Sequence, residues 1–231
     1  MCGRYASSRR PEDLVEEFDL DEGDLPPPIA PRWNVAPTDE VYAVMQRGER
    51  RLRVVRWGLV PSWAKEMKVG SKMINARAET VAEKPAFKPL LRKHRLIVPM
   101  DGFYEWKVVP GQKTKQPMFI HRADGEPLAV AGLWATWRDR DAGPDAPWLH
   151  SLTIITTSAN EMMSAVHDRM PVVLPPERWA EWLDPGNQDV DALKDLLVPA
   201  PNDLLTMHPV STSVNNVRNN SIELIDPVAV S

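Results

Sequence analysis

The sequence predicts an α+β domain built on antiparallel sheet. Short apolar runs rich in β-branched and aromatic residues recur along the 231-residue chain, with turn residues between them, which is typical of strands. Few neighbouring runs are separated by a helical pattern, and this disfavours a parallel, doubly wound sheet. No break in composition divides the chain, so we expect residues 1–231 to form a single domain.

The expected elements follow in order along the chain. Residues 11–19 predict a helix, because Pro11 suits a first helical turn and Leu14 and Phe18 lie four residues apart on one face. The proline-rich stretch 21–32 predicts an extended loop. Strands are expected at 41–46, 52–57, 96–100, 103–109, 117–121, 128–134 and 152–157, helices at 84–94, 159–166, 176–183 and 190–197, and loops at 110–116 and 139–147.

The composition is that of a soluble globular protein. Hydrophobic residues make up 43% and charged residues 26% of the chain, and no apolar run approaches the ~20 residues that a membrane span needs. One cysteine cannot form an intramolecular disulfide, which favours a reducing, cytoplasmic compartment. We expect neither a metal site nor a cofactor, because no metal-ligand spacing links His94, His121, His150 and His208.

The net charge of −4 hides an uneven distribution of charge. Residues 1–115 carry 21 Lys and Arg against 16 Asp and Glu, whereas residues 116–231 carry 7 against 16. Within 47–115 the basic residues number 17 and the acidic residues 6. An excess of this size can bind phosphates even on an acidic protein, and a solvated basic surface explains it equally well.

Cys2 is the most informative residue of the chain. Removal of Met1 would leave it as the N-terminus, and a small second side chain permits ordinary methionine removal. A free N-terminal cysteine carries an amine and a thiol on adjacent carbons, and this pair condenses with an aldehyde to an imine and then to a thiazolidine ring. A lone cysteine is also a common small, buried hydrophobe, so its position leaves both interpretations open.

Two segments carry groups suited to proton transfer. Glu105 lies among aromatic residues in the run 102–107, and a carboxylate in apolar surroundings is suited to exchange protons near neutrality. His167 follows a predicted helix and could act as an acid or base, while Arg169 could hold a phosphate. An exposed glutamate and a structural histidine are the alternative interpretations.

Asn75 and Arg77 lie two residues apart, so in an extended segment both side chains point the same way, suited to position a sugar or a phosphate. A turn capped by Asn75, with Arg77 paired to Glu79, explains the segment equally well. Nine tryptophans are many for this length, and those beside basic residues, such as Trp63, could stack unpaired bases. Burial in the core is the default for each tryptophan.

Taken together, the motifs resemble those of the SRAP family, the SOS response-associated peptidases, also called abasic-site processing proteins. They occur in the family's order over residues 2–227: CGRY at 2–5, WNVAPT at 33–38, RWGLVPSW at 56–63, NARAET at 75–80, DGFYEWK at 101–107, TTSAN at 156–160, HDRMP at 167–171 and HPVS at 208–211. Two positions depart from the family pattern. Met100 stands where many relatives have a second cysteine, and Ala64 stands where some have another aromatic residue.

The resemblance implies a single α+β domain around twisted antiparallel sheets, with a barrel-like core and peripheral helices. It also implies that the protein binds single-stranded DNA containing abasic sites and forms a covalent thiazolidine crosslink through the N-terminal cysteine. The implied roles are crosslinking for Cys2, orientation of the sugar and the terminus for Asn75, acid/base catalysis for Glu105 and His167, phosphate contacts for Arg4, Arg77 and Arg169, and further DNA contacts for Asn34, Pro37 and Trp63. We expect a cytoplasmic monomer, on the nucleoid when bound to DNA, with no membrane partner.

Two other functions stay open at this point. A cysteine N-terminal-nucleophile peptidase would use the Cys2 thiol on an amide with its own amine as base, and removal of Met1 would then be self-catalysed. A non-covalent single-strand binding module would treat Cys2 as incidental. A peptidase turns over a peptide, a crosslinker is consumed stoichiometrically, and a binding module gives no covalent product.

Overall fold

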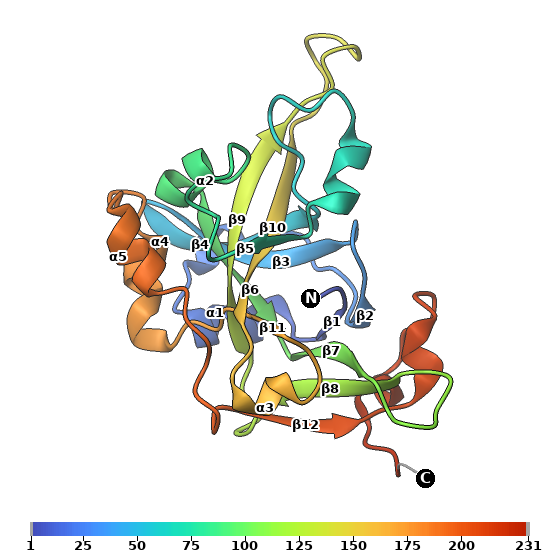
Figure 1. Cartoon of the computed structure of the whole chain (residues 1–231). Coiled ribbons are helices and arrows are strands. Elements are labelled where there is room, and N and C mark those ends of the chain that lie inside the picture. Colours follow the sequence, from blue (N-terminus) through green and yellow to red (C-terminus); the bar gives the residue numbers. More distant parts are fainter. Residues whose placement is uncertain (1, 230–231) are drawn as a thin grey trace.

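Two sheets frame the fold in the computed structural model, which describes residues 2–229 (Figure 1). The smaller sheet has the strand order β12 (Leu205–Pro209), β8 (Gln116–Arg122), β7 (Gly102–Lys107), β1 (Tyr5–Ser7) and β2 (Arg32–Val35). The larger sheet has the order β11 (Arg169–Pro171), β10 (Leu149–Ser158), β4 (Glu49–Trp57), β3 (Glu40–Arg47), β6 (Arg95–Met100) and β9 (Leu128–Trp137). β5 (Asn75–Arg77) pairs with β10.

The larger sheet closes on itself, because β9 pairs with β6 on one side and with β10 on the other. This closure removes the free edges of the ring β10–β4–β3–β6–β9 and makes it a barrel. The expected α+β class with a barrel-like core is therefore confirmed. The pairings are antiparallel except for two that the sequence did not predict: β10 runs parallel to β4 and to β5.

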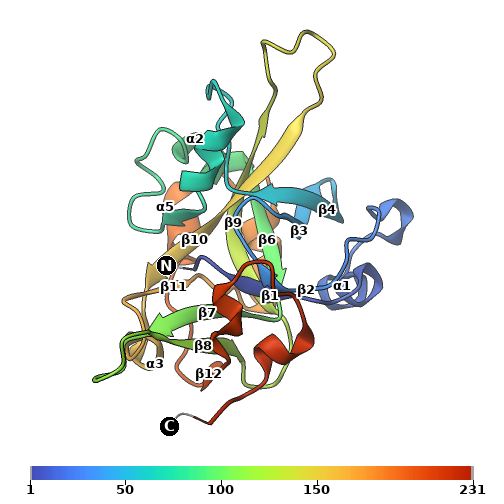
Figure 2. The same cartoon turned by 90° about the vertical axis from the view of Figure 1, so that its right-hand side faces the viewer.

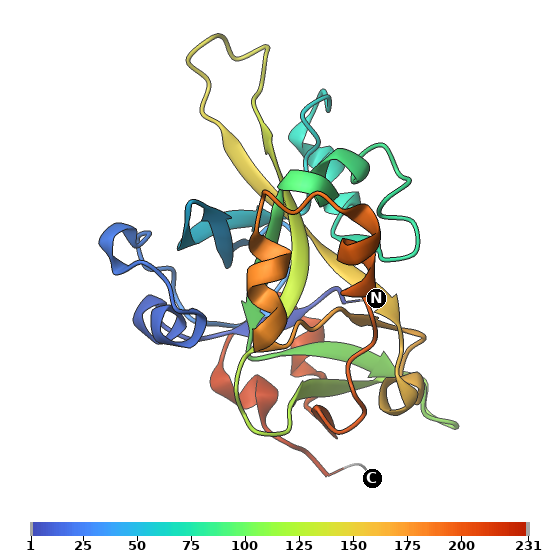
Figure 3. The same cartoon turned by 90° about the vertical axis from the view of Figure 1, so that its left-hand side faces the viewer.

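Within residues 2–229, five short α-helices lie outside the sheets: α1 (Pro11–Phe18), α2 (Lys88–Lys93), α3 (Glu161–Ser164), α4 (Trp179–Leu183) and α5 (Val190–Asp195). Figure 3 shows the orange helices α4 and α5 in front of the barrel. Trp182 of α4 is fully buried and donates its indole N–H to Leu96 O of β6 at 2.9 Å. Phe18 of α1 stacks on Trp179 with ring centroids 4.6 Å apart, so α1 and α4 seal the same part of the core. No helix in residues 2–229 is long and apolar enough to cross a bilayer.

One hydrophobic cluster joins the two sheets. It combines Cys2, Tyr5 and Phe103 from the smaller sheet with Trp57 and Leu152 from the barrel, all of them fully buried. Because both sheets contribute to one interior, they form a single packed unit. β1 is the strand that carries the start of the chain into this interior (Figures 1 and 2).

Each predicted strand and helix is present, with shifted ends. The helix expected at 84–94 begins only at Lys88, because Pro89 fits a first helical turn and no later position. The helix expected at 159–166 shortens to α3, and Asn160 caps it by accepting the N–H of Met163 at 2.9 Å. The loop expected at 21–32 ends at Arg32, where β2 begins.

Five strands escaped prediction: β1, β2, β5, β11 and β12. Each has three to five residues, which is too short to show an alternating pattern in the sequence. They exist because a longer neighbour pairs with them; β10 alone holds both β5 and β11.

Gly58 marks a close backbone approach at the end of β4. Its φ is +118°, and a Cβ there would lie 2.7 Å from Gly70 O, so an alanine must displace backbone. Gly48 has a φ of +85°, and a Cβ there would have nothing within 4 Å, which makes it a matched control for backbone conformation alone.

We expect Gly48→Ala to lower the free energy of unfolding in urea by about 1 kcal/mol. Gly58→Ala should lower it by about 3 kcal/mol, since overlap adds to the backbone cost. Equal losses would contradict the close approach.

Candidate functional site

Cys2 is fully buried and lies just before the start of β1. β1 lies between β2 and β7 in the smaller sheet, and Tyr5 pairs with Val35 on one side and Phe103 on the other. The N–H of Tyr104 donates to Arg4 O at 2.9 Å, which continues the β1–β7 ladder toward Cys2. The first residues are thus fixed by strand pairing on an interior strand of the sheet.

Asn75 fixes the backbone of Cys2 directly. Its side-chain N–H donates to Cys2 O at 2.8 Å. Parallel pairing of Asn75 with Ile154 holds β5 in place, so the extended interpretation is correct and the capped turn is wrong. The side-chain Oδ1 of Asn75 is buried and accepts no hydrogen bond from residues 2–229. The Asn75 side chain therefore donates its N–H to the Cys2 backbone, and its Oδ1 has no donor among residues 2–229.

Glu105 lies beside the same terminus. The register that pairs Ala6 with Gly102 and Tyr5 with Phe103 places Glu105 opposite Gly3 when it is continued by two residues. Only 5% of Glu105 is exposed, so the exposed-glutamate interpretation is wrong. Burial first, and the negative charge of Glu105 second, raise the pKa of the Cys2 thiol far above its ordinary value. At neutral pH this thiol is therefore protonated.

His167 lies in the loop between α3 and β11, with 30% of its side chain exposed. Its Nδ1 is 2.9 Å from the backbone N–H of Arg169 and 2.8 Å from a carboxylate oxygen of Asp168. When the ring is neutral, Nδ1 accepts the Arg169 N–H and Nε2 carries the proton. The acid/base role assigned to His167 stays a prediction.

Arg169 forms an ion pair with Glu79. Its guanidinium donates to both carboxylate oxygens of Glu79, at 2.5 and 2.9 Å, and to Thr156 O at 2.7 Å. One of the two interpretations of the sequence paired Glu79 with Arg77, but the Glu79 carboxylate hydrogen-bonds to Arg169 instead. Arg77 instead projects from β5 as an exposed side chain. The phosphate contacts assigned to Arg77 and Arg169 stay predictions.

Arg4 and Asn34 are hydrogen-bonded to each other and to the backbone of the segment 214–219. Arg4 Nη1 donates to Asn34 Oδ1 at 2.7 Å and to Val214 O at 2.9 Å. Asn34 is fully buried, and its amide donates to backbone carbonyls of the segment 214–219. The structure gives Asn34 a bracing role; direct contact between Asn34 and DNA stays a prediction.

Pro37 and Trp63 lie on turns, Pro37 half-buried and Trp63 exposed. Pro37 lies in the turn between β2 and β3, next to Thr38, whose φ of +83° fixes a sharp change of direction. Trp63 is 63% exposed, in a loop that is anchored because Trp137 donates its indole N–H to Ala64 O at 2.7 Å. An anchored, exposed indole is a suitable surface for a base to stack on.

Two features of the site had no clear signal in the sequence. Tyr5 packs on Trp57 with ring centroids 5.1 Å apart, and its buried hydroxyl has no hydrogen-bond partner among residues 2–229. Glu79 is the ion-pair partner of Arg169, from a segment 90 positions away. Only the pairing of β5 and β11 with β10 brings Glu79 and Arg169 together. No cluster of three or more potential metal ligands occurs within residues 2–229.

Comparison with known proteins identifies the family. The family described as SOS response associated peptidase (SRAP) matches residues 1–217. The chain belongs to the SRAP family. It is 44% identical over 227 residues to the abasic site processing protein YoaM of Bacillus subtilis (strain 168), covering 98% of both chains. It is 39% identical to the abasic site processing protein YedK of Escherichia coli (strain K12), covering 99% of this chain and 100% of that protein.

Solved structures share the fold of this SRAP protein. A protein from Bacteroides thetaiotaomicron, 23% identical, superposes with a TM-score of 0.86 over 99% of this chain and 100% of the other. A phage-related protein from Bordetella bronchiseptica, 33% identical, superposes with a TM-score of 0.69 over 90% of this chain and 94% of the other.

The raised pKa of the Cys2 thiol predicts slow reaction with thiol reagents. In the chain that retains Met1, Cys2 should react with a disulfide reagent more than about tenfold more slowly in the native state than in guanidinium chloride, because reaction requires an accessible thiolate. Glu105→Gln removes the neighbouring charge at nearly constant size and should speed the native reaction. Equal native and unfolded rates would contradict the burial.

Proposed function

We propose that this SRAP protein binds single-stranded DNA containing an abasic site and forms a covalent thiazolidine crosslink through Cys2. The observation that carries the proposal is the convergence of three groups. Asn75 holds the Cys2 carbonyl at 2.8 Å, and Glu105 lies close enough for its charge to raise the pKa of the Cys2 thiol. Relatives at 39–44% identity are named abasic site processing proteins.

The first step is attack of the Cys2 amine on the sugar aldehyde. An abasic deoxyribose exists partly as a ring-opened aldehyde at C1′, and proton transfer by Glu105 assists the opening. The amine adds to C1′ to give a carbinolamine, which loses water to give an imine. Glu105 and His167 supply and remove the protons of these steps. The reaction requires the amine to be free, so Met1, which lies outside the described residues, must first be removed.

The thiol completes the reaction. Its sulfur bonds to C1′ while its proton passes to the imine nitrogen, so the product is a neutral five-membered ring with no atom lost. A protonated thiol suits this order, because it leaves the first attack to the amine and brings its own proton to the second. Ring closure removes the imine, which otherwise promotes β-elimination and strand cleavage. The crosslink therefore shields the lesion.

Positioning accounts for much of the rate. Asn75 fixes the terminus from the β5 side, and its Oδ1 is available to accept a hydrogen bond from the terminus or the sugar. Holding the two reactants in reacting geometry contributes several kcal/mol to lowering the barrier. In this proposal Arg4, Arg77 and Arg169 contact phosphates. For Arg169, a phosphate would replace the Glu79 carboxylate as the anion bound to the guanidinium.

The same residues suit a second function, self-catalysed removal of Met1. The family is described as a peptidase family, and the bond between residues 1 and 2 precedes the carbonyl that Asn75 holds. In this second candidate the Cys2 thiol attacks the Met1 carbonyl carbon, the C–N bond breaks to give a thioester and the free Cys2 amine, and water hydrolyses the thioester to release methionine, with Glu105 and His167 moving the protons. It complements crosslinking, because it would produce the free amine. We further propose that the protein works as a cytoplasmic monomer.

The crosslink is tested by intact-mass spectrometry of the Met1-free protein with a single-stranded oligonucleotide that carries one abasic site. Wild type should give a heat-stable adduct of one protein per strand, at the mass of both minus one water. Cys2→Ala keeps the amine and loses the sulfur, so it should give an adduct only after borohydride reduction, together with strand cleavage. A correctly processed wild type without an adduct would overturn the proposal.

The acid/base assignment has its own test. Glu105→Gln and His167→Ala should slow adduct formation by about 10²–10⁴-fold, the usual contribution of proton transfer, while the affinity for the strand stays near that of wild type. Unchanged rates would remove these residues from the mechanism. Release of free methionine from chains that carry Glu105→Gln measures the second candidate, since a self-catalysed removal should slow in parallel.

A further inference from the structure

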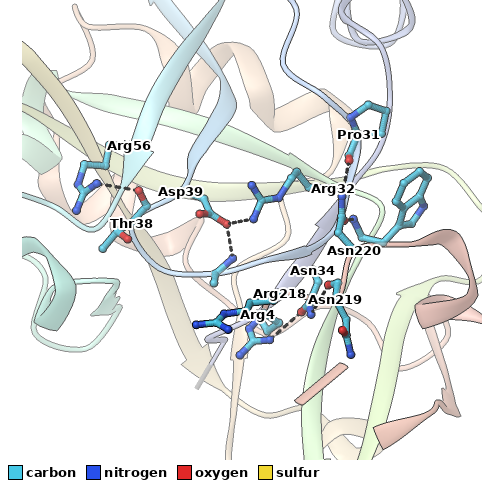
Figure 4. A network of polar contacts seen from close by, with 12 residues as sticks. Arg4, Pro31, Arg32, Asn34, Thr38, Asp39, Arg56, Arg218, Asn219 and Asn220 are labelled. Atoms are coloured by element: carbon cyan, nitrogen blue, oxygen red, sulfur yellow. Dashed lines mark hydrogen bonds and ion pairs between the residues drawn. The ribbon is translucent and has the colours of Figure 1, made fainter. Parts of the chain in front are cut away.

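The turn between β2 and β3 is braced by an ion pair. Asp39 accepts from Arg32 Nη2 at 2.6 Å and from the N–H of Ala36 at 3.0 Å (Figure 4). These two bonds lock the left-handed residue Thr38 in the turn. Arg32 is thereby fixed at the start of β2, two residues before Asn34, so the strand presents its guanidinium in one place.

Asn34 brings a distant segment to the same place. It is fully buried, and its amide donates to three backbone carbonyls, Val214 O at 3.2 Å, Asn216 O at 3.1 Å and Asn219 O at 2.9 Å. Asn220 adds a second attachment, accepting the Trp33 N–H at 2.8 Å and donating to Pro31 O at 3.1 Å. The segment 214–220 is therefore fastened along β2 by side-chain hydrogen bonds.

Arg218 lies within this fastened segment. Arg218 lies between Asn216 and Asn219, both of which contact Asn34, and Asn34 accepts from Arg4 at 2.7 Å. Figure 4 shows the Arg218 and Arg4 side chains in the same part of the network. The backbone N–H of Arg218 donates to Asn216 Oδ1 at 3.1 Å, which fixes the base of its exposed side chain.

Positive charge exceeds negative charge in this network. Arg4, Arg32 and Arg218 supply three guanidinium groups, and Asp39 is the one carboxylate that pairs with them within residues 2–229. Arg4 donates to amide oxygens only, so its charge has no ion-pair partner among the described residues. Partly buried cations with spare donors are the groups that bind phosphate oxygens in proteins.

The cluster of Arg4, Arg32 and Arg218 adjoins Cys2, and the neighbouring Arg56 does not belong to it. Arg4 is two residues from Cys2, so an anion held here lies next to the proposed crosslink. Arg56 donates to Thr38 O at 2.8 Å on the β4 side of the same turn. Arg4 and Arg218, which have no carboxylate partner within residues 2–229, lie on the side of the segment 214–220.

We propose that Arg4, Arg32 and Arg218 form one phosphate-binding site, in which Arg32 and Arg218 add contacts to the sugar-phosphate backbone of the bound strand. The inference rests on the proposed function and extends it. It assigns to the segment 214–220 a direct part in nucleic-acid binding, with Asn34 as the residue that positions it. The ligand is a phosphodiester within a strand; a free phosphate is the alternative that the experiment separates.

The test measures non-covalent affinity for a single-stranded oligonucleotide that carries a tetrahydrofuran abasic analogue, which has no aldehyde and cannot crosslink. Each phosphate contact on a single strand contributes about 0.7 to the slope of log K against log salt. Arg218→Gln should reduce the slope by about 0.7 and the affinity by about fivefold at roughly 0.1 M salt. Arg218→Lys keeps the charge and should retain most of the slope. Arg92→Gln, an exposed arginine on α2, is the control and should match wild type.

Several outcomes separate the possibilities. An Arg218→Gln slope equal to that of wild type would overturn the site, as would an equal loss for Arg92→Gln, which would indicate a general charge effect. Inorganic phosphate that binds wild type but not Arg218→Gln at millimolar concentration, while both proteins bind the strand with the same affinity and the same slope, would show a free-anion site and overturn the strand assignment. If wild type binds no strand at any salt concentration, the proposed function itself fails.

Arg32→Gln is a second variant with a distinct signature. It removes a guanidinium and leaves Asp39 without its partner, so it should reduce the slope at least as much as Arg218→Gln and also weaken the turn. The double variant Arg32→Gln/Asp39→Asn restores the local balance of charge. If its slope returns to that of wild type, Arg32 acts only through the turn and is not a phosphate contact.

Discussion

The hydrogen bond from Asn75 to the Cys2 carbonyl is the interaction on which the rest of the site depends. Alone it is worth about 1 kcal/mol, and it acts on a buried residue that precedes the paired strand β1. Strand pairing fixes the chain only from Arg4 onward. Asn75 extends that order to Cys2, so that in the proposed reaction the amine and thiol would meet the sugar from one direction.

The barrel explains why a residue from the middle of the chain can do this. β10 is the long strand to which both β5 and β11 attach, so it sets the positions of Asn75 and Arg169 together. The smaller sheet sets the positions of Cys2 and Glu105 through the pairing of β1 with β7. The shared hydrophobic cluster locks the two sheets, and the site forms where they meet.

The long strands and the residues with distinctive chemistry could be predicted from the sequence. The barrel strands are apolar runs, and the motif residues carry reactive groups, so both could be read from the chain. The buried position of Glu105, the pairing of Arg169 with Glu79 and the bracing by Asn34 could not, because each is set by contacts between segments as far as 90 or 185 positions apart or by the register of three-residue strands. Asn34 shows the limit best: its motif indicated importance, and only the structure shows that its side chain faces inward.

The central claim is that the Cys2 nitrogen and sulfur both bond to the sugar C1′, and carbon NMR of the complex tests it most directly. An abasic oligonucleotide labelled with ¹³C at C1′ is mixed with the Met1-free protein. The account predicts that the C1′ signal moves to the region of a saturated carbon bonded to nitrogen and sulfur, and that Cys2→Ala abolishes this signal. A C1′ signal that stays at the position of the free sugar, or stops in the imine region with wild type, would contradict it.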